Sequence, residues 1–438
     1  MPRSEPHSTR RRTVARVSVV CIAGLGILAA VWWFLANAGP AVGPPSRVLP
    51  QPNAYDWFCS ASSLLVDRNE LRALDVAYLH RPRTRVRGMS EKRSLLRKNI
   101  PALAELRDGL RHGFCWPRVK DWQSSGFDIR ALGRLLVLDG EVRADKGNWP
   151  GAMNAYLDAL EFGAKIVRGG NLGCFEEGRN VQMDARKRIH DTYKRLTALE
   201  LKAATGRMEA VRRLSVAYSE VLRQVRDQVT EDYVHLIFRN RNLFEAYDWY
   251  DRIYLATLRH DGFATGMIVK LRLLPYTKSR IVANWTRYMD KVITRVRLPY
   301  RDKHPFPPVP CDPFNERMVL DFEERWCDDL VNQADNGAMM TSLALRRFWL
   351  ENSSYPASLS ALVPGYLSRV PADPFSPKDA LRYERTRRGY LLYSVGPDGR
   401  DDGGRPIAAY PLPKSGSTEV STVRTYSRGD IVADVNAW

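Results

Sequence analysis

The sequence predicts a mostly α-helical protein that ends in a small α+β domain. Three observations support this prediction: one long uncharged segment near the N-terminus, a long stretch in which apolar residues recur every three or four positions, and a change to alternation near residue 380. The chain has 438 residues, of which 44% are hydrophobic and 26% are charged, so it can build sizeable cores. Because a single segment is long and apolar enough to span a bilayer, the composition excludes a polytopic transporter.

The long uncharged segment covers residues 17–38 and predicts one transmembrane helix. Arginines precede the segment and Trp32 and Trp33 lie near its far end, so the positive-inside rule places residues 1–16 in the cytoplasm and the bulk of the chain outside. We therefore predict a single-pass protein of the inner (cytoplasmic) membrane. The alternative is a cleaved signal peptide with a cleavage site at residues 36–38, although the apolar run is longer than the roughly 7–15 residues of a signal core.

Proline-rich stretches divide the remainder of the chain, because they fit neither helices nor central strands. The predicted organisation is a basic cytoplasmic tail (1–16), a transmembrane helix (17–38), a Pro-rich stalk (39–53), a helical domain (54–298), a Pro-rich linker (299–313) and a C-terminal α+β domain (314–438).

The helical domain is predicted from the spacing of its apolar residues. Asn148 and Pro150 are typical of a helix start, and the apolar residues that follow lie on one face. Further helices are expected over residues 174–203 and 207–260. The sequence around Asn148 is similar to the second half of a tetratricopeptide hairpin, but no second copy follows at the 34-residue period of such repeats. A helical bundle is therefore expected in place of a repeat array.

The C-terminal domain begins with a predicted long helix over residues 319–348, which Ser353, Ser354 and Pro356 should end. Alternating residues then predict two strands, 381–386 and 390–395, joined through Gly389. A long helix packed on a small antiparallel sheet is an α+β arrangement.

Five short motifs follow one another in this domain: residues 352–356 (NSSYP), 359–363 (LSALV), 365–367 (GYL), 371–375 (PADPF) and 393–399 (YSVGPDG). In this order they resemble the globular head of the type II secretion major pseudopilin, a relative of type IV pilins. The resemblance covers about a quarter of the chain, and residues 429–438 are similar to that family's Asp-Ile…Asn-Trp ending. It departs from the family because about 300 residues separate the anchor from the head. No pilin processing signal precedes residue 17. We therefore expect a pseudopilin-like head reused as a module, and no pilus subunit.

The resemblance implies a structural calcium ion, with Asp398, Asp402 and Asp430 as the matching carboxylates and Asp401 as a poorer match. The chemistry agrees, because calcium takes six to eight oxygen ligands and the surrounding glycines let carbonyls turn inward. The alternative is a solvated acidic turn whose side chains cap their own backbone. The stretch 405–428 is longer than the resemblance leads us to expect.

Five cysteines lie outside the predicted anchor, an odd number that leaves at least one unpaired. Cys311 and Cys327 are closest in sequence and offer one candidate bridge, and reduced buried thiols are the alternative.

The formal net charge of +18 favours anionic partners or reflects only solvated surface. Outside the cytoplasm, anionic lipid or a cell-surface polymer would be the target, and we expect no nucleic-acid partner because no nucleic-acid-binding fold accompanies the basic residues. Catalytic motifs are missing from the sequence. Asp248 and Asp251 beside aromatic residues leave open a glycan-binding or glycan-hydrolysing protein, with an ordinary amphipathic helix as the alternative. The sequence thus predicts a membrane-anchored scaffold or interaction protein of the cell envelope, associated with a secretion or pilus-like assembly and more consistent with a non-enzymatic role.

Overall fold

The computed structural model describes residues 26–27, 31, 48–74, 88–117, 127–240, 243–247, 268, 271–300, 302, 305–318, 321–387, 389–407 and 423–433. This part of the chain is mostly helical, with small antiparallel sheets near the C-terminus, as the sequence predicts. The chain divides into two compact units. The larger unit comprises Ser46–Val225, Val292–Phe306 and Asp321–Trp438, and the smaller comprises Met1–Pro45, Arg226–Lys291 and Pro307–Leu320.

The described helices are α2 (Ala54–Ser63), α3 (Arg68–Arg72), α4 (Met89–Lys98), α5 (Ile100–Leu110), α6 (Ile129–Asp145), α7 (Trp149–Lys165), α8 (Leu172–Thr192), η2 (Tyr193–Arg195), α9 (Ala198–Leu214), α10 (Tyr218–Arg239), α13 (Lys278–Val296), α14 (Pro313–Met318), α15 (Phe322–Asn352) and η3 (Leu359–Leu362). The described strands are β1 (Ala372–Asp373), β2 (Ser376–Ala380), β3 (Arg382–Arg385), β4 (Tyr390–Ser394) and β5 (Ile431–Val432).

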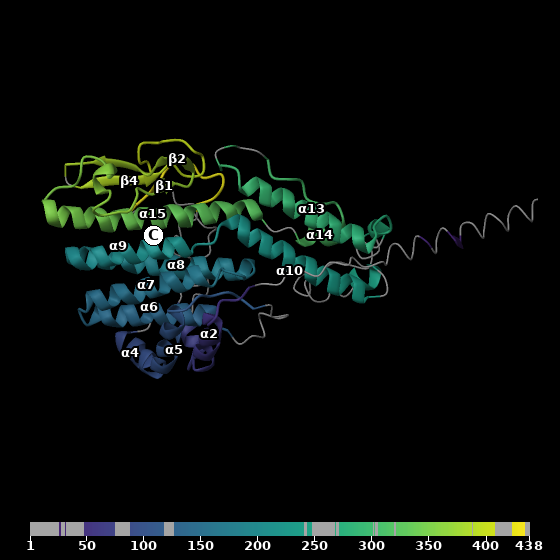
Figure 1. Ribbon diagram of the computed structural model, residues 1–438, viewed down its shortest axis with the longest axis horizontal. Helices are drawn as coiled ribbons and strands as arrows, with labels where there is room; N and C mark the ends of the chain where they lie inside the picture. The colour runs from purple at the N-terminus through teal and green to yellow at the C-terminus, as the bar shows by residue number, and fades with distance from the viewer. Residues whose placement is uncertain are drawn as a thin grey trace, which may run out of the picture. The chain divides into compact units, whose positions relative to one another are not determined.

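The helices of the larger unit lie in successive layers (Figure 1). Helices α2, α4 and α5 form one end, α6, α7, α8 and α9 follow, and α15 lies between α9 and the strands. An aromatic cluster fills the first layers, in which Phe58 stacks on Phe114 and meets Phe162 edge to face. One continuous apolar core runs from α2 to the strands, so these elements form one packed body.

Small residues let α7 approach its neighbours closely. Gly163 of α7 faces Gly178 of α8, and a Cβ atom added at Gly163 would lie 2.5 Å from the carbonyl oxygen of Gly178. A Cβ atom at Gly140 of α6 would lie 2.2 Å from the ring of Tyr156. These positions need glycine because backbone or a buried ring occupies the space of a side chain.

One predicted helix start holds, and two predicted helices are each interrupted. Helix α7 begins at Trp149 with Asn148 as its cap, as the sequence predicts. The predicted helix 174–203 is wrong as one piece, because η2 follows α8 and α9 begins after Thr197. Thr197 and Glu200 form a capping box, which starts a new helix. The predicted helix 207–260 is likewise interrupted at residues 215–217, and residues 248–260 lie outside the described residues.

The C-terminal elements match their prediction closely. Helix α15 ends at Asn352, where Ser353 takes a left-handed conformation, and β3 and β4 pair as the predicted antiparallel hairpin. Strand β5 adds to β4 and completes a three-stranded sheet, and β1 and β2 form a second, two-stranded sheet. We call α15 and the elements after it the C-terminal head. Proline content predicts a domain boundary at residues 299–313, and packing places the head in the same compact unit as α2–α9.

The smaller unit has its own aromatic centre, around Trp285 of α13. The ring of Tyr233 lies near those of Trp285 and Phe314, and its hydroxyl donates to the carbonyl of Phe314 at 3.2 Å. Asp312 and Asn315 join this centre to α13, because Asn315 donates to the carbonyl of Ile281 at 3.0 Å. The buried aromatic rings and the hydrogen bonds that join them explain why this unit packs by itself.

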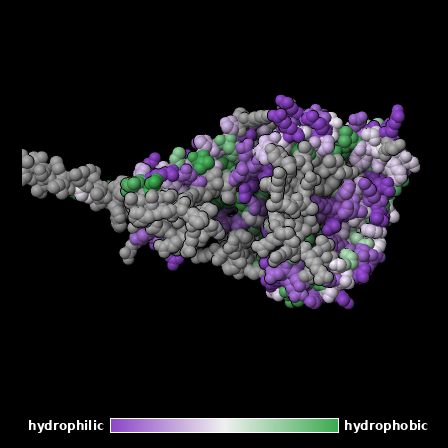
Figure 2. All heavy atoms as spheres, turned by 180° about the vertical axis from the view of Figure 1, so that it is seen from behind, coloured by the Kyte–Doolittle hydropathy of each residue, from purple (hydrophilic) through white to green (hydrophobic). Residues whose placement is uncertain are grey.

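Among the described residues no helix is long and apolar enough to cross a membrane. Residues 17–38, the predicted anchor, lie almost wholly outside the described residues. On the face shown in Figure 2, the described surface is mostly hydrophilic and its hydrophobic residues are scattered.

Candidate functional site

The acidic loop, residues 396–407, holds Asp398, Asp401 and Asp402, and it packs against the strand region 429–433, which holds Asp430. The loop pairs with the final strand region, because the N–H of Asp430 donates to the carbonyl of Arg405 at 2.8 Å. Gly396 and Gly404 have positive φ angles and no room for a side chain, since an added Cβ would lie 2.6 Å from the carbonyl oxygen of Gly429 and 2.5 Å from Leu391, respectively. The loop conformation therefore depends on glycine at these positions.

Asp430 closes this loop from within. Its carboxylate is fully buried and accepts hydrogen bonds from the N–H of Gly404 at 2.7 Å and of Asp402 at 3.4 Å. Burial raises the pKa of Asp430, the two N–H donors lower it, and the nearby carboxylates of Asp401 and Asp402 raise it further. A buried carboxylate beside two others is an unfavourable arrangement, and hydrogen bonds offset part of its cost.

The other two predicted ligands lie at the same loop but have other partners. Asp398 accepts the N–H of Arg400 at 3.1 Å and that of Gly429 at 3.4 Å, so it joins the two halves of the loop region. Asp402 forms an ion pair with Arg405 at 3.2 Å. The structure thus brings Asp398, Asp402 and Asp430 to one loop without aiming them at one point.

The residues that the structure describes include no group of three acidic, histidine or cysteine side chains placed to hold a metal ion. The carboxylates of the acidic loop are instead engaged by backbone N–H groups and arginines. As arranged, these residues form a loop held by hydrogen bonds and ion pairs. Calcium binding stays a prediction.

Asp373 is a structural carboxylate that the sequence analysis did not single out, although it lies in the motif at residues 371–375. It is 1% exposed and accepts from the hydroxyl of Ser394 at 2.7 Å and the N–H of Val395 at 2.9 Å. Burial raises the pKa of Asp373, and these hydrogen bonds oppose the shift. Asp373 therefore ties the turn between β1 and β2 to the end of β4.

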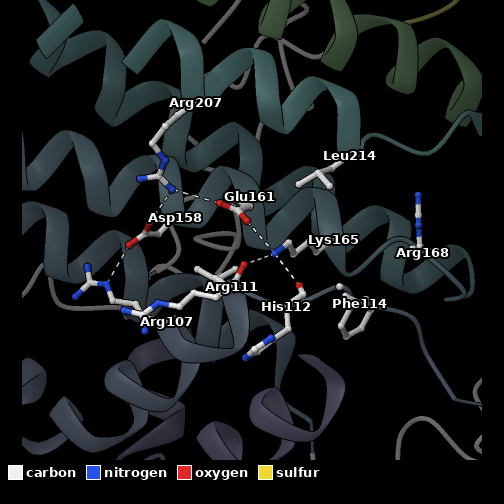
Figure 3. Close-up of a pocket in the computed structure, with 12 residues that line it drawn as sticks. Arg107, Arg111, His112, Phe114, Asp158, Glu161, Lys165, Arg168, Arg207 and Leu214 are labelled. Carbon is white, nitrogen blue, oxygen red and sulfur yellow. Dashed lines mark hydrogen bonds and ion pairs between the residues drawn. The ribbon is translucent and has the colours of Figure 1, made fainter. Parts of the chain in front are cut away.

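A second candidate site lies among the helices, where α5, α7 and α9 surround a pocket of about 670 Å³ (Figure 3). We call it the basic pocket, because cationic side chains outnumber acidic ones in its lining. The lining comprises Arg107, Leu110, Arg111, His112, Gly113, Phe114, Asp158, Glu161, Lys165, Arg168, Arg207 and Leu214. Its volume is within the roughly 300–1,000 Å³ of ligand-binding pockets.

Ion pairs alternate along one wall of the basic pocket. Asp158 of α7 pairs with Arg107 of α5 at 3.0 Å and with Arg207 of α9 at 2.9 Å. Glu161, one turn further along α7, pairs with Arg207 at 3.3 Å and with Lys165 at 2.8 Å. Figure 3 shows this row crossing the three helices. The row satisfies both carboxylates and fixes the spacing of the helices.

Lys165 is buried at the inner end of that row. Its ammonium donates to the carbonyls of Leu110 and His112, which lie at and just beyond the C-terminal end of α5. A cation at this position satisfies carbonyls that the helix leaves open and complements its dipole. The ring of His112 stacks on Trp57 at 4.4 Å between centroids, which places it against α2.

The remaining sequence candidates are only partly described. Asp248 and Asp251, proposed for glycan chemistry, lie outside the described residues. The basic stretch 81–87 also lies outside them. All five cysteines of the described part are free thiols, including Cys311 and Cys327, the pair that the sequence offers for a bridge.

No family model matches this chain, and comparisons with curated proteins and with solved structures found no match.

Proposed function

We propose that this protein is a membrane-anchored scaffold or interaction protein of the cell envelope, which associates with a secretion or pilus-like assembly through its pseudopilin-like head. Residues 17–38 would hold it in the inner membrane, with the helical layers and the head outside. One observation carries the proposal: α15, the long helix of the head, is covered on both sides.

One side of α15 packs on α8 and α9. Arg325 pairs with Glu176 of α8 at 2.7 Å, and Arg179 of α8 pairs with Asp328 at 2.9 Å. In the head, Ser368 donates to Glu209 of α9 through both its N–H and its hydroxyl, each at 2.8 Å. These contacts leave that side of α15 no room for a second copy of the helix.

The other side of α15 carries the sheets of the head. Trp326 of α15 and Phe375 both contact the ring of Tyr300, and Thr425 donates to Glu324 at 2.6 Å. A helix enclosed in this way cannot stack with other helices along a filament. This enclosure favours the role of a fixed platform for other proteins and disfavours that of a filament subunit. The link to secretion rests on the resemblance alone.

In-cell photo-crosslinking tests this proposal. A photoreactive amino acid replaces Thr386, exposed in the β3–β4 turn of the head, and a matched control replaces Lys146, exposed in the turn between α6 and α7. We expect Thr386 to capture one discrete envelope protein, identified by mass spectrometry, and Lys146 to capture none. Equal products from both sites, or none from several exposed positions of the head, would contradict the proposal.

The membrane arrangement is tested separately. A reporter that is active only outside the cytoplasm, fused after Trp438, should be active in the full chain and inactive once residues 17–38 are deleted. Release of the active reporter into the soluble fraction would instead favour the cleaved signal peptide.

Calcium at the acidic loop is a separate part of the proposal. It is supported by Asp398 and Asp430 meeting at one loop and by the raised pKa of Asp430, whose carboxylate a cation would stabilise. The melting temperature of the full chain is compared in calcium and in chelator. We expect calcium to raise it in the native chain and in the control Asp379→Asn, and to leave it unchanged in Asp398→Ala. An unchanged melting temperature in the native chain would show that hydrogen bonds alone hold the loop.

A further inference from the structure

We propose that the basic pocket between α5, α7 and α9 binds the carboxylate groups of an acidic segment of a partner protein. The proposal deepens the scaffold function and rests on it only in taking the ligand to be a protein. The argument depends on which cations of the pocket are already engaged and which are not.

The inner cations are engaged by the chain's own carboxylates. Arg107 contacts Asp158 and Asp139, Arg207 contacts Asp158 and Glu161, and Lys165 contacts Glu161 and two backbone carbonyls. Each carboxylate of the lining therefore has two cationic partners. A further acidic group would meet no unpaired carboxylate on this wall of the pocket.

Two arginines at the edge of the pocket are differently placed. Arg168, which follows α7, is exposed, and its side chain has no ion-pair partner among the residues that the structure describes. Within the described part of the chain, Arg111 forms an ion pair only with Asp108, at 3.2 Å, and its side chain is 77% exposed. An exposed pair of this kind contributes little stability, because solvent screens both charges. Both guanidinium groups can thus accept a new anionic partner at small cost.

The pocket's lining indicates what the anion should be attached to. Arg107 and Arg207 already bind carboxylates there, which shows that the spacing of these helices accommodates that group. Leu214 and Phe114 supply an apolar part to the same lining, and Figure 3 shows them on the side of Lys165 and Arg168. Carboxylates on short apolar stems beside a peptide backbone match this mixture, so we favour a Glu- or Asp-rich protein segment over an inorganic anion.

The test uses the full chain in detergent micelles and a fluorescein-labelled triglutamate peptide, with binding followed by fluorescence anisotropy. We expect saturable binding that weakens as salt rises, because screening reduces the attraction between exposed charges. The double variant Arg111→Glu/Arg168→Glu should bind at least about ten-fold more weakly, since attraction becomes repulsion at both positions. Both arginines are exposed, and an unchanged melting temperature confirms that the variant folds.

The matched control is Lys146→Glu/Arg213→Glu, which changes the net charge equally at exposed positions outside the pocket. Loss of binding in both double variants to the same extent would overturn the proposal, because it would show attraction to net charge alone. No saturable binding by the native chain would also overturn it. Displacement of the peptide by equimolar inorganic phosphate would reassign the pocket to phosphate-bearing ligands.

The test is independent of the scaffold proposal. If a partner crosslinks to Thr386 and the native chain does not bind triglutamate, only the pocket proposal fails. If triglutamate binds and Thr386 captures nothing, only the scaffold proposal fails.

Discussion

The interface between α8 and α15 and the basic pocket are built from the same residue types and differ in burial. At the interface Arg186 is 2% exposed and donates to Asn332 at 2.6 Å and Asn336 at 3.0 Å, with Asp335 at 3.4 Å. At the pocket the side chain of Arg207 is 33% exposed and meets two carboxylates. Arginine joins neighbouring helices in both places, but the contacts of Arg186 are closed to solvent and those of Arg207 are open to it.

Burial changes what these charges do. It raises the pKa of Asp335 to about 7, although the attraction of Arg186 lowers it, and burial also lowers the pKa of Arg186. One carboxylate oxygen of Asp335 and Nε of Arg186 have no hydrogen-bond partner in the described part of the chain. The interface therefore depends on a few irreplaceable contacts, whereas the pocket has redundant pairs that leave charge available for binding.

Arg186→Met, at the interface between α8 and α15, is expected to cause the largest loss of stability. At about pH 8 the Asp335 carboxylate would be buried without its cation, and a broken buried pair costs about 3–5 kcal/mol. Urea unfolding of the full chain measures this loss. The double variant Arg186→Met/Asp335→Leu should recover much of it, because no buried charge then lacks a partner. A loss below about 1 kcal/mol in the single variant would show that the interface tolerates an unpaired charge.

The second-largest expected loss of stability comes from the close packing of α7 on α8. Gly163→Ala places a Cβ against the Gly178 carbonyl, so α7 and α8 must separate, at a cost of about 1–3 kcal/mol. The control is Gly206→Ala in α9, where an added Cβ meets no atom within 4 Å. It should stabilise the chain by about 0.5–1 kcal/mol, because alanine favours the helix. Thermal unfolding compares the two variants, and equal shifts would mean that the close approach is not needed.

The buried carboxylates of α15 should also make stability depend on pH. Burial raises the pKa of Asp329 to about 7, with Arg179 and a hydrogen bond from Gln333 opposing the shift and Asp328 adding to it. Asp335 has the same raised value. The folded chain then keeps protons that the unfolded chain, with carboxyl pKa values near about 3.9, has released.

The stability that these protons provide is complete below about pH 4 and is lost as the pH rises through about 7. Urea unfolding across that window should show falling stability, and Asp329→Asn should flatten the decline. The pocket carboxylate Asp158 serves as the control, and Asp158→Asn should leave the decline as it is. If Asp329→Asn loses stability with rising pH as steeply as the native chain does, other groups cause the pH dependence.

The features that the sequence predicts well are local. Alternation and turn residues identify β3 and β4, and the apolar stripe identifies α15, because each pattern depends on neighbours a few positions away. The break between α8 and α9 was also readable from Thr197 and Glu200, a capping box that the apolar spacing obscured.

The sites are harder to predict because they depend on packing. The order of motifs places Asp398 and Asp430 at one loop, but it does not show that N–H groups engage them. The basic pocket gave no sequence signal beyond the four-residue spacing of Arg107 and Arg111. Its other cations come from α7 and α9, and only the stacking of the helices brings them to α5.

Arg207→Met is expected to cause the smallest loss of stability, and it completes the comparison with Arg186→Met. Removing the Arg207 guanidinium leaves Asp158 paired with Arg107 and Glu161 paired with Lys165, so neither carboxylate loses its last cation. All four groups are partly open to solvent or have several partners, and such pairs contribute about 0.2–1 kcal/mol. Urea unfolding should therefore show a loss of that size, several-fold below the loss in Arg186→Met. A loss of about 3 kcal/mol or more would mean that the pocket row is as indispensable as the buried interface, and burial would then not be what distinguishes them.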